Sequence, residues 1–199
     1  MHRQIIAAAA ATLLFFTLTG CGDDAKEKAG DDSTKSTRTA DETKAIDSLT
    51  TLFGSKENAS SAKFFGEEFP HCFAETLVDE AGVDRLVEDK VLTEDKEATD
   101  DFSKVGKVSD DSAQALATAE YDCIDWDEVT KYLKENNPAG ESVAADELAK
   151  VDDYVTCMKE IDEDAWKAAS QDRASGKTKS PAITAFDAAS SACQAKAPK

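Results

Sequence analysis

The feature that most constrains this chain is a set of four widely spaced cysteines in the part that follows an N-terminal apolar segment. Each lies on the apolar face of a helix predicted from hydrophobic spacing, and no stretch shows the alternation typical of a strand. The four are Cys72, Cys123, Cys157 and Cys193. None belongs to a Cys-x-x-Cys pair, which argues against a thioredoxin-like redox site and against structural zinc. The sequence therefore predicts an all-α fold in which cysteines connect packed helices.

Start and stop signals place most of the predicted helices. Ala81-Gly82 ends the first, Asp125 caps another, and Ser180-Pro181 begins the last. The expected helices cover 68–80, 83–87, 110–123, 126–135, 143–160 and the segment after 181. Around Ala165-Trp166 the sequence predicts only a short apolar turn.

The first 21 residues have the pattern of an export signal. Arg3 precedes an uncharged apolar run over 5–18, which is too short to span a bilayer comfortably and ends at Leu18-Thr19-Gly20-Cys21. This ending resembles a bacterial lipobox. The resemblance implies a lipoprotein signal peptide over 1–20 that is cleaved, and a Cys21 that carries diacylglycerol and further acylation such as palmitate. Two or more acyl chains are enough for stable anchoring to a membrane.

Residues 21–43 are predicted to form a disordered tether. After Cys21 the segment is rich in Asp, Lys, Ser, Thr and Gly and has no large apolar side chain, so it buries too little surface to offset the entropy of ordering it. Residues 44–199 are expected to form a helical domain. Its length suits one compact unit or two small units that share a core.

Export also bears on the state of the cysteines. With Cys21 taken by lipid, the five cysteines of the chain leave an even four in an oxidising compartment, which predicts two disulfides. Four cysteines allow three connectivities. A weak internal duplication, with halves at 60–138 and 139–196, favours Cys72 with Cys123 and Cys157 with Cys193. The alternative is that any helical sequence rich in Ala and Asp resembles itself.

A second resemblance covers roughly residues 65–170. The segment from Cys72 through Gly82-Val83-Asp84 to Leu86, followed by Asp122-Cys123-Ile124-Asp125-Trp126, is similar to a pattern in exported and lipid-anchored proteins of actinobacteria. Pro70-His71 and a polar insert over 93–109 depart from that pattern. The resemblance implies an all-helical exported module at the outer face of the bacterial cytoplasmic membrane. It implies no particular activity.

The chain is strongly acidic. It has 41 acidic and 23 basic residues and a formal net charge of −18. This balance argues against binding to nucleic acid and against adsorption to anionic lipid. A cationic partner would be attracted, but solvation of an exported domain accounts for the same charge.

Few side chains are candidates for chemistry. His71, the one histidine after the leader, is more typical of a structural residue at a helix start than of a catalytic base. An acidic set suggests calcium but lacks the alternating ligands, the glycine and the final Glu of an EF-hand loop. The set comprises Asp122, Asp125, Asp127 and Glu128. We therefore assign no catalytic, metal-ligating or cofactor-binding residue.

Two tryptophans, Trp126 and Trp166, could stack on a sugar or another ligand. Their corresponding places after cysteine-bearing helices favour the alternative, that they anchor the core. Asn58 begins an Asn-Ala-Ser glycosylation acceptor, which carries little meaning in a bacterial lipoprotein.

These observations favour a non-enzymatic, lipid-anchored protein of the cell envelope that acts as an interaction or sensing module. Its expected partners are the membrane, through Cys21, and either an envelope protein or a small ligand. The first alternative is a ligand-binding lipoprotein for a small solute. The second is an envelope hydrolase, which would have to use His71 or a pair of carboxylates.

Overall fold

The computed structural model describes residues 38–55, 63–99, 107–136 and 145–198. Within these ranges the protein is built of helices, and the one extended contact is an isolated bridge between Leu92 and Ala98. The all-α fold predicted from hydrophobic spacing is therefore confirmed. The leader, Cys21 and Asn58 lie outside the described residues. None of the helices in the described ranges is long and apolar enough to cross a membrane.

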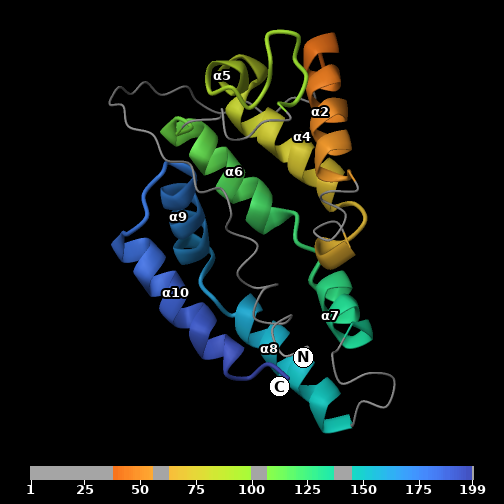
Figure 1. The fold of residues 1–199 in the computed structure, drawn as a ribbon, viewed down its shortest axis with the longest axis vertical. Coiled ribbons are helices and arrows are strands. Elements are labelled where there is room, and N and C mark those ends of the chain that lie inside the picture. The colour runs from red at the N-terminus through yellow and green to blue at the C-terminus, as the bar shows by residue number, and fades with distance from the viewer. Residues whose placement is uncertain (1–37, 56–62, 100–106, 137–144, 199) are drawn as a thin grey trace, which may run out of the picture.

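The helices form an elongated assembly in which α6 occupies the middle (Figure 1). Helix α4 packs against one side of α6 and α2 packs against α4, whereas α9 packs against the other side of α6 and α10 packs against α9. Helix α7 packs against α8 at the far end, and α8 also contacts α10. The bounds are α2 Ala40–Phe53, α4 Phe69–Ala81, α5 Val83–Glu88, α6 Asp110–Asp122, α7 Trp126–Glu135, α8 Ala145–Lys159, α9 Glu163–Ala174 and α10 Pro181–Gln194.

Short polar side chains fix where several helices begin. Asp125 Oδ1 accepts hydrogen bonds from the backbone N–H groups of Asp127 and Glu128, and Ser180 Oγ accepts one from Ile183. Both residues were predicted as caps. At the end of α4, Gly82 has a φ of 76°, a left-handed conformation that glycine adopts without steric cost, so the helix stops where the sequence predicts.

Two segments differ from the sequence prediction. Helix α2 begins at Ala40, inside the segment 21–43 predicted as a disordered tether, because Thr39 and Glu42 cap it reciprocally. Helix α9 has 12 residues where only a short turn was expected around Trp166, and Asp162 caps it through the N–H of Ala165. The prediction was therefore wrong for residues 40–43 and for the extent of α9, and each helix has a cap that accounts for it. Residues 21–37 of the predicted tether lie outside the described residues.

The Thr39 cap leads to the first testable prediction. Thr39 Oγ1 accepts from the N–H of Glu42 at 3.2 Å, and Glu42 Oε2 accepts from the N–H of Thr39 at 2.6 Å. Replacing Thr39 with alanine should lower the free energy of unfolding by about 1 kcal/mol. Urea denaturation measures the loss, with Thr51→Ala as an exposed control in the same helix. Equal effects of the two substitutions would contradict the capping role.

Two disulfides join the helices. Cys72 on α4 is bonded to Cys123 at the end of α6, and Cys157 on α8 is bonded to Cys193 on α10. The sequence separations are 51 and 36 residues. This is the pairing that the internal duplication favoured among the three connectivities.

One hydrophobic core runs through both of the proposed halves. A single cluster of buried residues contains side chains from α2, α4 and α6 as well as from α8, α9 and α10. Helices α6 and α9, which pack against each other, both carry small side chains that are fully buried, among them Ala113, Ala119 and Ala169. Small residues let the two helix backbones approach closely, so the halves share their packing.

Candidate functional site

A partly enclosed cavity lies where residues of the two halves meet. The centres of water-sized molecules can reach a volume of about 50 Å³ inside it. This is room for a few waters, because roughly 10–15 Å³ of this measure holds one. Its lining residues come from both halves and are mainly aromatic and aliphatic. They are Phe64, Phe65, Glu120, Ile124, Trp126, Val129, Tyr154, Met158, Trp166, Phe186 and Ser190.

A tight turn brings the two phenylalanines to the cavity. Gly66 has a φ of 112°, and a Cβ atom there would lie 3.2 Å from the Cβ of Asp125. The carbonyl of Phe65 accepts a hydrogen bond from the N–H of Asp125. Glycine therefore lets this turn lie directly against the start of α7. Phe64 then packs edge-on against Tyr132 of α7, with ring centroids 5.5 Å apart.

Trp166 is the centre of the aromatic wall. It is 2% exposed, and its ring lies edge-on to Trp126 at 5.9 Å and to Phe186 at 5.0 Å between centroids. Trp126 is partly buried. The structure thus brings together the two tryptophans that the sequence treated as separate anchors. Trp166 does belong to the core, and both tryptophans also line the cavity.

Glu120 is the acidic residue of the cavity wall. It lies on α6 facing α9, is partly buried, and makes no ion pair with a basic side chain of the described ranges. Burial raises the pKa of its carboxyl from 4.5 to about 7, although polar contacts with Ser170 and Trp166 and the charge of Arg173 act in the opposite direction. The dominant cause is desolvation, which disfavours the charged form. Near neutral pH this carboxyl is therefore present in both its protonated and its ionised form.

The raised pKa predicts that Glu120 makes the fold less stable as the pH rises. The unfolded chain releases this proton near pH 4.5 and the folded chain near 7, so the folded state holds more protons between these values. The contribution of Glu120 should be fully present below pH 4.5 and fall by about 3 kcal/mol up to pH 7, at 1.36 kcal/mol for each pKa unit.

Glu120→Gln measures this contribution, because the amide has the same shape and does not titrate. The difference in unfolding free energy between the variant and the native protein, from urea denaturation at several pH values, should grow in favour of the variant between pH 4.5 and 7. A difference that stays constant with pH would contradict the raised pKa.

Sequence reasoning missed Glu120. The signal was its position, since it follows Ala113 by seven residues and Ala117 by three and so falls on the buried stripe of α6. A carboxylate on an otherwise alanine-rich buried face is unusual, because Glu is almost never buried unless paired.

Two buried donors lie beside this site. The Nη1 of Arg173 makes no hydrogen bond to the described residues, and the indole Nε1 of Trp166 makes none of good geometry, although it lies near enough to Glu120 to lower the pKa of that carboxyl. Arg173 uses its Nη2 in a 2.6 Å ion pair with Asp187, and its guanidinium lies 5.2 Å from the ring centroid of Phe186. The cavity is mainly apolar, but these N–H groups beside it could donate hydrogen bonds.

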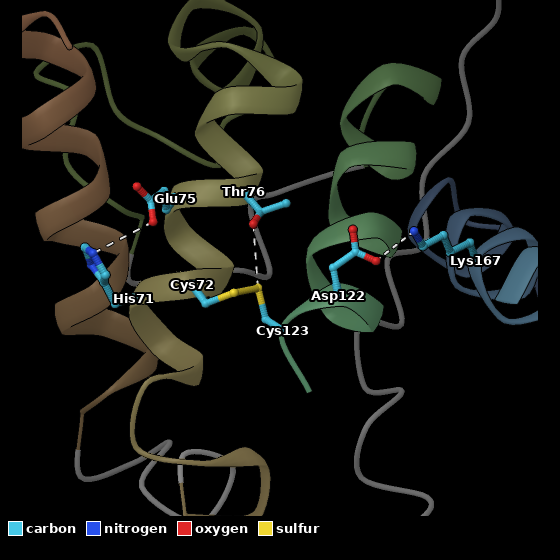
Figure 2. Close-up of a disulfide and its surroundings, with 7 residues drawn as sticks. All are labelled: His71, Cys72, Glu75, Thr76, Asp122, Cys123 and Lys167. Carbon is cyan, nitrogen blue, oxygen red and sulfur yellow. Dashed lines mark hydrogen bonds and ion pairs between the residues drawn. A yellow bond between two sulfur atoms is a disulfide. The ribbon is translucent and has the colours of Figure 1, made fainter. Parts of the chain in front are cut away.

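The other residues considered from sequence do not lie together at this cavity. His71 is exposed and points to Glu75 on the same helix, with 4.0 Å between His71 Nε2 and Glu75 Oε2, on a side of α4 away from the Cys72–Cys123 disulfide (Figure 2). No catalytic arrangement forms around His71 among the residues shown.

The acidic set is spread over separate contacts. Asp122 pairs with Lys167 of α9 at 2.8 Å (Figure 2), and Glu128 pairs with Lys131 at 3.2 Å. Asp125 is the cap of α7 and Asp127 is almost fully exposed. In the described ranges, no group of three or more His, Cys, Asp or Glu side chains is arranged to hold a metal ion.

Comparison with protein-family models, with curated proteins and with solved structures found no match to this chain.

Proposed function

We propose that this chain is a non-enzymatic, lipid-anchored module of the cell envelope that senses or carries a small solute in the cavity around Trp166. The observation that carries the proposal is the cavity itself. It has mainly aromatic and aliphatic walls and one acidic side chain, and its lining comes from α6, α7, α8, α9 and α10. Ligand sites are typically concave and mostly apolar, with a few polar groups that fix orientation.

The disulfides support this proposal because they brace the cavity on two sides. Cys123 directly precedes Ile124, which lines the cavity, and Cys157 directly precedes Met158, which also lines it. A wall held rigid before binding loses less conformational entropy when the ligand arrives. The disulfides therefore favour a preformed binding site over a site that forms only when the ligand binds.

The location in this proposal depends on the leader. Cys21, lipidated and freed from the signal peptide, would hold the protein at the outer face of the bacterial cytoplasmic membrane. The polar segment before Thr39 would then separate the helical domain from the lipid surface. Membrane fractionation of cells that express the native protein or Cys21→Ser tests the anchor. Recovery of the variant in the membrane fraction would contradict it.

Binding can be tested with the two tryptophans of the chain, because both line the cavity. We expect ethanol, isopropanol or isopropylamine, in millimolar titrations, to change the tryptophan fluorescence saturably and to raise the melting temperature. Each has no more than four heavy atoms, which matches the few waters for which the cavity has room, and a ligand that binds only the folded state stabilises it.

Val129→Phe, which adds bulk to the lining, should abolish the fluorescence change. Val87→Phe makes the same substitution on α5, away from the cavity, and should leave the change intact. If none of the three compounds binds the native protein, or if both variants behave alike, the cavity is not a ligand site.

A further inference from the structure

We propose that the Cys72–Cys123 disulfide is a redox switch that an external dithiol opens, whereas Cys157–Cys193 is a purely structural bond. This inference goes beyond the proposed function and does not depend on a ligand in the cavity. Each disulfide joins a partly buried cysteine to a buried one, so exposure alone does not distinguish the two. They differ in the groups that surround their sulfur atoms.

A hydroxyl group lies beside the sulfur of Cys123. Thr76 Oγ1 is 3.6 Å from Cys123 Sγ (Figure 2). A disulfide sulfur has no proton, so the hydroxyl is the donor in this contact. A hydrogen bond to an ionised acceptor is stronger than one between neutral groups. Thr76 therefore favours Cys123 as a thiolate, the form in which this sulfur leaves when the disulfide is attacked.

The position of Cys72 favours a thiolate as well. Cys72 is the fourth residue of α4, and a helical side chain points back toward the N-terminal turn. The free N–H groups of a first turn favour negative charge, and no side-chain hydrogen bond caps them in α4. Both sulfurs of this disulfide thus have a neighbour that stabilises the reduced, ionised form.

Nearby carboxylates oppose this effect only weakly. Those drawn beside the disulfide in Figure 2 have counter-ions, since Glu75 pairs with Arg38 at 2.5 Å and Asp122 pairs with Lys167 at 2.8 Å. Glu68, one turn before Cys72, is exposed to solvent, which screens its charge.

The second disulfide lacks this support. Cys157 lies in the last turn of α8 and Cys193 in the last turn of α10, where unpaired carbonyl groups disfavour negative charge. Cys123 also ends a helix, but there the Thr76 hydroxyl offsets the effect. Within the described residues, no hydroxyl donates to either sulfur of Cys157–Cys193. This bond should therefore stay oxidised where Cys72–Cys123 opens.

The opening is a thiol–disulfide exchange with a dithiol as the reductant. One thiolate of the dithiol attacks Cys72, the more exposed cysteine of the pair, and releases Cys123 as a thiolate beside Thr76. The second thiolate then attacks the mixed disulfide and releases Cys72. Two electrons pass to the protein, the dithiol becomes a disulfide, and its two protons are taken up by the cysteines. Because Ile124 follows Cys123 and lines the cavity, opening the bond releases part of the cavity wall.

The test measures the opening of both disulfides in the same molecule. The native protein is treated with dithiothreitol without denaturant, its thiols are alkylated at intervals, and mass spectrometry gives the rate for each bond. We expect Cys72–Cys123 to open about tenfold faster than Cys157–Cys193. Equal rates, or faster opening of Cys157–Cys193, would overturn the switch.

Two variants isolate the hydroxyl. Thr76→Val keeps the branched shape without the donor, so it should slow the opening of Cys72–Cys123 severalfold and leave Cys157–Cys193 unchanged. Thr76→Ser keeps the donor and should open at nearly the native rate. An unchanged rate in Thr76→Val would overturn the role of Thr76. If Thr76→Val loosens the fold and opens both bonds faster, glutathione decides, because its mixed disulfide on the native protein should lie on Cys72 and a mixed disulfide on Cys123 would overturn the assignment.

A switch must also be reversible. The protein reduced only at Cys72–Cys123 should keep the far-UV circular dichroism of the native protein, since Cys157–Cys193 and the common core remain. Oxidised glutathione should then restore the bond. Unfolding on selective reduction would show that Cys72–Cys123 is structural as well, and would overturn the inference.

Discussion

Removing the Cys72–Cys123 disulfide, by replacing both cysteines with alanine, should lower the free energy of unfolding by up to about 4 kcal/mol on the loop-entropy model. The bond closes a segment of 51 residues between α4 and α6. Without it, the unfolded chain gains conformational freedom that the native state does not. Domains of this size are typically stable by about 5–15 kcal/mol, so the loss would be a large part of the total.

The second disulfide supplies a matched comparison. Cys157–Cys193 closes 36 residues, and because loop entropy grows only with the logarithm of length, its removal should cost nearly as much. Urea denaturation of the two double-alanine variants and of the native protein, with and without reductant, gives the three free energies. Reductant should destabilise the native protein more than either variant. A native protein that reductant leaves unchanged would contradict the role of both bonds.

Much of the fold could be predicted because its signals are local. Asp125, Gly82 and Ser180-Pro181 act through their own backbone neighbours, so a short window of sequence contains the whole cause. The cysteine pairing is not local, but the repeated order of helices within the chain favoured one of its three connectivities. The cap at Thr39 was equally local, as Thr39-Ala40-Asp41-Glu42 has the spacing of a capping box, and it was overlooked beside the polar tether.

The cavity could not be predicted in the same way. The buried apolar residues of α9 are Trp166 and Ala169. Two residues are too few to form an apolar pattern that can be recognised among the charged residues around them. Glu120 is partly buried because α9 packs against α6. That contact joins residues about 50 positions apart, and no pattern within either helix specifies it. The candidate site depends on tertiary packing.

The same packing makes Trp166 the second residue with a large expected effect. Trp166→Ala should lower the free energy of unfolding by about 3–5 kcal/mol, the usual cost of replacing a buried tryptophan with alanine. The side chain is 2% exposed and contacts the rings of Tyr121, Trp126 and Phe186, which belong to three other helices. Its removal would enlarge an existing cavity, so little of the lost volume could be refilled by its neighbours.

Trp126→Ala is the control for this substitution, because Trp126 lies at the first position of α7, is only partly buried and contacts the same cavity. It should cost clearly less than Trp166→Ala. Urea denaturation followed by far-UV circular dichroism, which does not depend on either tryptophan as a probe, gives both values. Similar losses for the two variants would mean that stability depends on the cavity wall as a whole. A loss below about 1 kcal/mol for Trp166→Ala, the range of an ordinary surface change, would contradict its central place in the packing of the two halves.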